Sequence, residues 1–327
     1  MESAGVDGRS IGLAGVAAAA LLLVGCEKLP ERELTVYEMA RLELTPERTR
    51  RAERLCAELV DPVYSYQDRA GFIMDVRACG PAATPALCRL LKHQDAGIRN
   101  LAVSVLAEVG DARAVPDLVA LVNDKKQDAR TIREWAVSGL GRIGDPRASD
   151  ALVAALKDKA PGIRSGAAAG LGRAGKPTAV PALIRTLEDP VLDVRKYATY
   201  SLGSLRDQRA VDPLIKTLQH RDARMRSWAV RSLSMIGGAR TIGPVNAVAA
   251  NAKEDEEVRL DAIVALGRIG GRQVRELLKA LLNNPSPRIH LQTTETLKWM
   301  DARAQAERLK AAAVQAPSRE IHTTPAR

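Results

Sequence analysis

The sequence predicts an all-α protein built as a solenoid of about eight two-helix repeats. Composition is the first observation behind this prediction. Only 3% of the 327 residues are aromatic, whereas β-sandwiches and barrels need aromatic and β-branched side chains on their pleated faces. Ala, Leu, Arg and Glu dominate instead, and these residues favour helices. The composition therefore disfavours all-β folds.

A recurring residue pattern is the second observation. An aliphatic-Arg pair is followed by Ala three residues after the Arg, Leu at seven and Gly at eleven. After Ile132-Arg133, for example, come Ala136, Leu140 and Gly144. The arginines that mark the regular repeats are Arg99, Arg133, Arg164, Arg195, Arg226 and Arg259.

The constant spacing of this pattern is the third observation. The intervals between the marker arginines are 34, 31, 31, 31 and 33 residues. Arg69 before them and His290 after them mark two degenerate copies, and the terminal repeats of a solenoid are usually degenerate. We therefore expect eight repeats.

Each repeat is predicted to contain two helices. The first carries a Pro in its opening turn, as in Val115-Pro116 and Val180-Pro181, where the missing N–H costs nothing. The second runs from the aliphatic-Arg pair to the Gly, which can adopt the positive φ of a C-terminal cap. The position before the Arg and positions +3, +7 and +10 after it share one apolar face. Neither helix can bury its stripe alone, so neighbouring repeats must stack.

Glycines are also expected between the second helices. A Gly at position +8, eight residues after the marker Arg, lets these helices approach closely. Each such Gly costs about 1 kcal/mol in helix propensity. The glycines at this position are Gly141, Gly172, Gly203 and Gly267.

These residues resemble the short HEAT repeats first associated with phycobilin lyases, from about Pro46 to Met300. The resemblance implies a right-handed α-solenoid whose second helices line a concave surface. It implies little about activity, because this fold serves many unrelated functions.

The recurrent arginines are expected to be structural. In similar repeats the equivalent Arg bridges loops and helix ends of adjacent units, often through an Asp. The acidic candidates just upstream of the arginines are Asp95, Asp128, Asp193 and Asp222. We favour this bridging role over ligand binding.

The first residues predict a lipid anchor. Ile11–Val24 carries no charge and is too short to span a bilayer, but it fits the apolar region of a secretory signal. Leu23-Val24-Gly25-Cys26 resembles a bacterial lipobox, which implies that Cys26 is lipidated. The alternative is a plain signal anchor or a buried apolar helix with an incidental Cys. Glu27, in place of Asp, favours the outer over the inner membrane of a bacterial envelope.

The expected organisation has four parts. They are a signal peptide at 1–25, a tether and N-terminal cap at 26–45, the solenoid at 46–300, and a C-terminal cap helix with a disordered tail at 301–327.

The rare aromatic side chains suggest a binding surface. Most of them fall at positions +2, +5 and +9 of the second helices, on or beside the expected concave face, together with several arginines. Trp and Tyr are enriched in interface hot spots, although position +2 also fits packing between repeats. The candidate partner-binding residues are Trp135, Arg142, Arg173, Tyr197, Tyr200, Trp228, Arg231 and Arg268.

Catalytic, metal and cofactor sites are not expected. Metal-dependent HEAT-repeat hydroxylases use His-Glu pairs, and none of the four histidines is followed by Glu. No HExxH, nucleophile elbow or Cys-His cluster is present. Cys56, Cys79 and Cys88 replace aliphatic residues of the predicted core. A disulfide that involves Cys79 remains open in an oxidising compartment.

The sequence therefore predicts a membrane-tethered, non-catalytic and monomeric scaffold that binds a protein or peptide on its concave face. The net charge of +10 is compatible with an acidic partner, and no nucleic-acid partner is expected. Two rival hypotheses stay open. One is a phycobilin-lyase-like enzyme. The other is a nucleic-acid binder with a basic concavity, which requires that the N-terminal segment is not a signal peptide.

Overall fold

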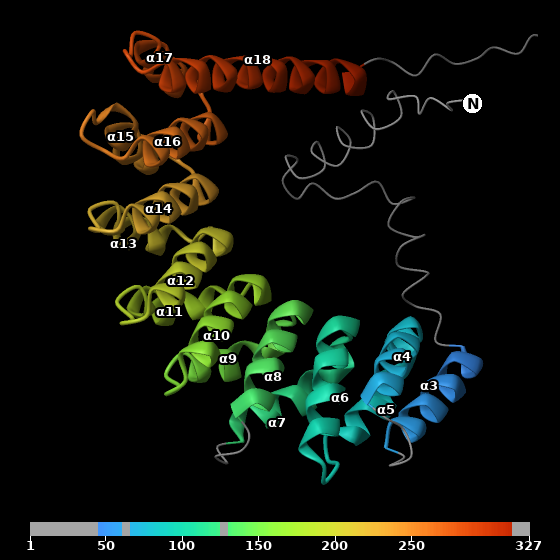
Figure 1. Ribbon diagram of the computed structural model, residues 1–327. Coiled ribbons are helices and arrows are strands. Elements are labelled where there is room, and N and C mark those ends of the chain that lie inside the picture. Colours follow the sequence, from blue (N-terminus) through green and yellow to red (C-terminus); the bar gives the residue numbers. More distant parts are fainter. Residues whose placement is uncertain (1–44, 61–65, 125–129, 316–327) are drawn as a thin grey trace, which may run out of the picture.

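The computed structural model describes residues 45–60, 66–124 and 130–315, which form sixteen α-helices and no strand. The helices pair in sequence order into eight repeats, as predicted. Figure 1 shows the pairs stacked side by side in an open arc, with the first helix of each pair outside and the second inside. The protein is an α-solenoid.

The outer helices are mostly short. They are α3 (Pro46–Leu59), α5 (Thr84–Leu90), α7 (Val115–Asn123), α9 (Ser149–Ala155), α11 (Val180–Thr186), α13 (Val211–Thr217), α15 (Ala239–Ala250) and α17 (Arg272–Leu281). Five of them follow a one-turn 3-10 helix. Pro stands in the first turn of α5, α7 and α11, as the sequence predicts.

The inner helices carry the marker arginines near their starts. They are α4 (Tyr66–Ala78), α6 (Ala96–Val109), α8 (Arg130–Ile143), α10 (Pro161–Ala174), α12 (Leu192–Leu205), α14 (Ala223–Ile236), α16 (Glu256–Ile269) and α18 (Pro287–Gln315). The predicted apolar stripe is buried: Ile132, Ala136 and Leu140 of α8 are all in the core. Gly110, Gly144 and Gly175 cap helices at positive φ.

Small residues join the inner helices. A side chain at Gly141 would approach the Gly170 backbone to 3.0 Å, and one at Gly203 would meet the Ser232 backbone at 2.7 Å. Ser232 Oγ donates to the Thr199 carbonyl across the same contact. The predicted role of position +8 is confirmed. Because the inner helices pack this closely and the outer helices contact one another far less, the stack bends toward its inner side.

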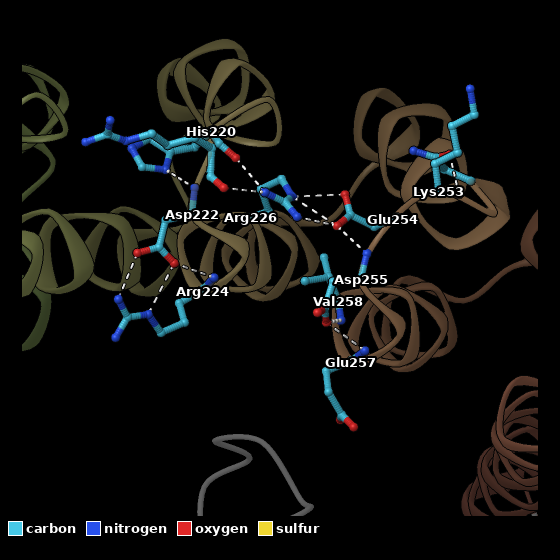
Figure 2. Close-up of polar contacts among 11 residues, drawn as sticks. His220, Asp222, Arg224, Arg226, Lys253, Glu254, Asp255, Glu257 and Val258 are labelled. Carbon is cyan, nitrogen blue, oxygen red and sulfur yellow. Dashed lines mark hydrogen bonds and ion pairs between the residues drawn. The ribbon is translucent and has the colours of Figure 1, made fainter.

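The marker arginines bridge successive repeats, as predicted, but through different acids. Arg164 donates to the Asp158 carbonyl of its own repeat and makes two hydrogen bonds, of 2.7 and 2.9 Å, to the Asp189 carboxylate of the next repeat. Arg133 pairs in the same way with Asp158, and Arg226 with Glu254. We call this row of contacts the inner ladder. Figure 2 shows its Arg226 rung.

The upstream acids proposed from the sequence are not the acids that pair with Arg133, Arg164 and Arg226 in the described chain. Asp95 caps the start of α6, and Asp222 caps α14 and pairs with Arg224. Asp193 is an exposed residue in the first turn of α12, and Asp128 lies outside the described residues. The true partners sit 25 to 28 residues downstream, because each guanidinium reaches forward to the next repeat's turn.

The acid in the turn therefore makes two kinds of contact, one within the turn and one with the arginine of the preceding repeat. Asp189 Oδ1 accepts the backbone N–H of Val191, which closes the turn, and both its oxygens accept from Arg164. His220 and Asn284 occupy the equivalent position two repeats apart. Their Nδ1 and Oδ1 atoms accept the N–H groups of Asp222 and Ser286, so the turn is kept.

Their arginines lose a partner. Among the described residues, Arg195 Nε and Arg259 Nη2 are buried without a hydrogen-bond acceptor. These are the two arginines whose following turn carries His220 or Asn284. For Arg226, two residues of the next turn share these contacts. Asn251 Oδ1 accepts the N–H of Lys253 and closes the turn, and Glu254 accepts from the Arg226 guanidinium.

A second row of arginines links the 3-10 turns on the outside. Asp145 caps one turn and binds Arg147, whose Nη2 donates to the Ala112 carbonyl of the preceding repeat at 2.9 Å. Arg113 and Arg209 make the equivalent bond to Pro81 and Pro177. The sequence reasoning missed this row, although Asp-x-Arg-Ala recurs at 111, 145 and 207.

Several predictions fall on residues outside the described ranges. Residues 1–44, which include the signal sequence and Cys26, and residues 316–327 are among them. In the described part of the chain, α18 runs through residue 301 without a break, so the cap helix continues the last inner helix. None of the described helices is long and apolar enough to cross a membrane.

Candidate binding surface

Aromatic rings stand exposed on the inner helices α8 and α12. Trp135 of α8 is 43% exposed, and Tyr197 and Tyr200 of α12 are 37% and 59% exposed. Trp228 of α14 is half-buried. The rings sit at positions +2 and +5 because those positions follow the core stripe around the helix onto its inner face. The structure therefore places the predicted aromatic residues on or at the edge of that face.

Between these rings, α10 contributes small residues at the equivalent positions. Gly162, Gly166 and Ala169 occupy the inner positions of this helix. A methyl group at Gly166 would come within 2.8 Å of Val137 of α8, so the neighbouring side chain already covers that spot. We call this region the α8–α12 surface: it consists of the small inner residues of α10 and of the rings on α8 and α12 to either side of them.

Two of the predicted aromatic anchors already hold a cation of this chain. Lys196 Nζ lies 5.3 Å from the ring centre of Tyr197 and 5.2 Å from that of Trp228, within cation–π range. Tyr197 and Trp228 are therefore engaged internally, whereas Trp135 and Tyr200 show no such contact with described residues. Trp299, in the last repeat, packs half-buried on the core, with Arg303 over its ring.

The four candidate arginines differ in how free they are. Arg231 makes bidentate hydrogen bonds to Asp261, so its charge is neutralised within the protein. Arg173 donates one N–H to the Gly141 carbonyl at 3.2 Å. Arg142 and Arg268 are exposed and contact no acid or carbonyl of the described chain. The structure thus separates one occupied arginine from three that retain free donors.

A surface hollow of about 410 Å³ lies between α4 and α6. It is lined by Met74, Ala78 and Val109 and by the ion pair of Arg77 with Glu108, whose N–O distance is 2.6 Å. Met74 is largely exposed. Sequence reasoning did not single out this region, because α4 belongs to the degenerate first repeat.

In the described part of the chain, two histidines take part in turns and two cysteines have raised thiol pKa values. His93 and His220 each accept a backbone N–H at Nδ1 in a turn. Burial raises the pKa of the Cys56 thiol to about 11. Burial, followed by a hydrogen bond to Asp117, raises the pKa of Cys88 to about 12. Both stay protonated near neutral pH, and the thiolate is the nucleophilic form.

Metal-binding geometry is likewise missing from the described ranges. No three His, Cys, Asp or Glu side chains of these residues are placed so that they could hold a metal ion. Cys56, Cys79 and Cys88 are free thiols in the structure.

Solved structures share this fold. YibA of Escherichia coli is 18% identical, with a TM-score of 0.50 over 84% of this chain and 99% of that chain. The phycocyanin lyase complex of CpcE and CpcF from Nostoc sp. PCC7120 is 21% identical, with a TM-score of 0.43 over 76% and 94% of the two chains. Computationally designed armadillo repeat proteins for modular peptide recognition are 18% identical, with a TM-score of 0.43 over 57% and 100%. At these identities the likeness concerns the fold alone.

Comparison with curated protein sequences found no match. The family of HEAT repeats, in contrast, matches four consecutive segments of the chain, residues 52–132, 125–198, 186–252 and 244–324. Together these segments extend over nearly the whole described solenoid and agree with the repeats seen in the structure. This chain belongs to the HEAT repeat family.

Proposed function

We propose that this HEAT-repeat solenoid is a non-catalytic scaffold that binds a protein or peptide partner on its inner face. The observation that carries the proposal is the exposure of Trp135 and Tyr200 on the two sides of the α8–α12 surface. The chain holds only three Trp and five Tyr, and Trp135 and Tyr200 both stand exposed on this one face. Trp and Tyr are also the residues that most often dominate binding energy at interfaces.

Free charge on the same face supports an acidic partner. Arg142, Arg173 and Arg268 present guanidinium donors at position +9 of α8, α10 and α16. Planar guanidinium groups suit bidentate contacts with carboxylates. Such contacts at a partly exposed rim add more to association rate and specificity than to affinity.

The binding experiment is crosslinking in intact cells followed by mass spectrometry of the captured partner. Trp135→Ala combined with Tyr200→Ala should lower capture at least tenfold while the thermal unfolding midpoint stays within a few degrees. Leu309→Ala is the matched control, because Leu309 is 64% exposed but lies on the distal part of α18. Equal loss of capture in the control, or no loss in the double variant, would contradict the proposal.

We also propose that the scaffold is tethered to the bacterial envelope by lipid on Cys26. The uncharged stretch Ile11–Val24 followed by Gly25-Cys26 supports this, since two or more acyl chains anchor a protein stably. Metabolic labelling with palmitate should mark the protein, and Cys26→Ser should abolish labelling and release the protein from the membrane fraction. An unlabelled protein, or one whose location is unaffected by Cys26→Ser, would remove the tether from the proposal.

A further inference from the structure

The spacing of the inner helices restricts which peptide conformations can follow them. Side chains at one repeat position recur at the distance between packed helices, about 8–10 Å. The contacts at Gly141 with Gly170 and at Gly203 with Ser232 show that these inner helices are closely packed. A partner that makes the same contact on successive repeats must present side chains at this interval.

An extended β-strand does not have this interval. Its side chains return to the same face every two residues, which is about 6.6 Å. A polyproline II helix returns to the same face every three residues, which is about 9.3 Å, and it needs no backbone hydrogen bonds from its partner. The inner face is made of helices whose backbone groups are already paired, so it offers no edge on which a strand could add.

The chemistry of the α8–α12 surface fits such a segment. Arg142 and Arg173 stand at the same position of consecutive repeats. Arg142 meets no described acceptor, and Arg173 uses one N–H on the Gly141 carbonyl and keeps its other donors. The row ends there, because Ser204 and Met235 take this position in α12 and α14. The surface therefore has two adjacent places for a carboxylate.

The rings complete the fit. Polyproline II ligands dock in recognition sites lined by aromatic rings. Trp135 and Tyr200 supply exposed rings on either side of α10. At the positions equivalent to the rings, α10 carries only Gly166 and Ala169, so no large side chain of α10 stands between Trp135 and Tyr200.

We propose that the α8–α12 surface binds a polyproline II segment of the partner, with acidic side chains three residues apart on Arg142 and Arg173 and proline rings against Trp135 and Tyr200. This inference rests on the proposed function and specifies the partner segment. It does not depend on Cys26 or on the tether.

Peptides of matched composition test the register. A fluorescent ten-residue Pro-rich peptide with Glu residues three positions apart is compared with one whose Glu residues are two positions apart, and with a Gln version of the first. Fluorescence anisotropy with the full chain at 0.15 M salt measures the affinities. The peptide with three-residue spacing should bind at least tenfold more tightly than both others.

Variants of the protein test the contacts. Arg142→Gln should reduce the preference for the three-residue spacing, and Trp135→Ala should weaken all Pro-rich peptides. Arg185→Gln is the matched control, because Arg185 is an exposed arginine on the outer helix α11. It should leave binding unchanged.

Equal affinity for both Glu spacings, or binding that Arg142→Gln does not affect, would overturn the inference. So would the absence of peptide binding by a protein that still captures its cellular partner through Trp135 and Tyr200. In that last case the proposed function stands, and the partner is a folded surface or another kind of segment.

Discussion

The residues that the marker arginines face in the next turn differ in how many acceptor atoms they offer. Asp189 offers two oxygens and serves both the turn and Arg164, whereas His220 and Asn284 have one acceptor atom and serve only the turn. The sequence predicts that the arginines are bridges, because they recur with the repeat. It does not predict the acid, because an Asp in a turn can cap a helix, close the turn or pair with a neighbour, and only the stacked structure distinguishes these roles.

Restoring the second acceptor should stabilise the protein. We expect His220→Asp and Asn284→Asp each to raise the free energy of unfolding by about 1–2 kcal/mol, since a buried guanidinium N–H gains a charged partner. The reciprocal variant Asp189→Asn keeps the turn but removes the charge, and it should lower stability by a similar amount. Urea unfolding of the three variants measures these changes. A destabilised His220→Asp protein would show that the imidazole makes a contact that an acid cannot replace.

Arg206 is the one non-glycine residue with positive φ in the described chain, at 52°. It stands where Gly110, Gly144 and Gly175 cap the other inner helices. Because a left-handed conformation costs a residue with a Cβ about 1 kcal/mol, Arg206→Gly should stabilise the protein by about that amount. Arg185→Gly, within the helical region of α11, should instead cost about 0.5–1 kcal/mol. Thermal unfolding of both variants checks the contrast.

At the scale of elements, the inner helices are held by backbone proximity rather than by large side chains. From α8 to α14, positions +6 and +8 are all Gly or Ser, and Ser201 and Ser232 donate hydrogen bonds across the contact. The glycine positions are visible in the sequence because they recur. The serine bonds are not, because a helical Ser more often bonds to its own helix.

This close contact is sensitive to a single methyl group. We expect Gly203→Ala to cost about 1–3 kcal/mol, because its Cβ would sit 2.7 Å from the Ser232 backbone, which cannot move freely. Gly71→Ala in α4 is the control: nothing lies within 4 Å of its Cβ, so the better helix propensity of Ala should add about 0.5–1 kcal/mol. Denaturant midpoints of the two variants should therefore move in opposite directions.

For the whole molecule, the sequence predicts the number of repeats, the two-helix unit and the inner position of the second helices, and the structure confirms each of these. The sequence does not predict which side chains of the inner face are free to contact a partner. Lys196 between two rings and Asp261 on Arg231 are contacts between neighbouring residues or neighbouring repeats, and no periodic pattern encodes them. For this reason two of the four aromatic candidates hold a cation of this chain, and one of the four arginines is paired with an acid.

We expect low pH to destabilise the protein by protonating the carboxylates in its turns. Burial works to raise the pKa of Asp189, but hydrogen bonds from Arg164 and from the Val191 N–H outweigh it and hold the pKa below its usual range. Hydrogen bonds from Arg147 and Arg209 hold the pKa values of Asp145 and Asp207 down in the same direction. A carboxyl whose folded pKa is lowered stabilises the fold fully above its unfolded value, about 4, and loses this contribution as the pH falls below it.

The unfolding midpoint should thus be nearly constant between pH 7 and pH 5 and fall steeply below pH 4. Asp189→Asn should shallow that fall, because one of the responsible carboxyls is gone. A midpoint that already drops between pH 7 and pH 5 would point to histidines instead of these carboxylates. Thermal unfolding monitored by circular dichroism across this range distinguishes the two cases.

Each rung of the inner ladder joins a marker arginine only to the turn of the next repeat. The number of repeats can therefore change without breaking the contacts between the repeats that remain. Removal of residues 196–226 would join Arg195 directly to Ser227 in the register of the repeat. Arg195 would then meet Glu254, and Gly172 would face Ser232 instead of Ser201. Such a shortened chain exchanges the Arg226–Glu254 rung for an Arg195–Glu254 rung and loses the turn at His220, where Arg195 finds no acid. Duplication or loss of whole repeats can therefore change the length of this protein while the remaining contacts between repeats are kept.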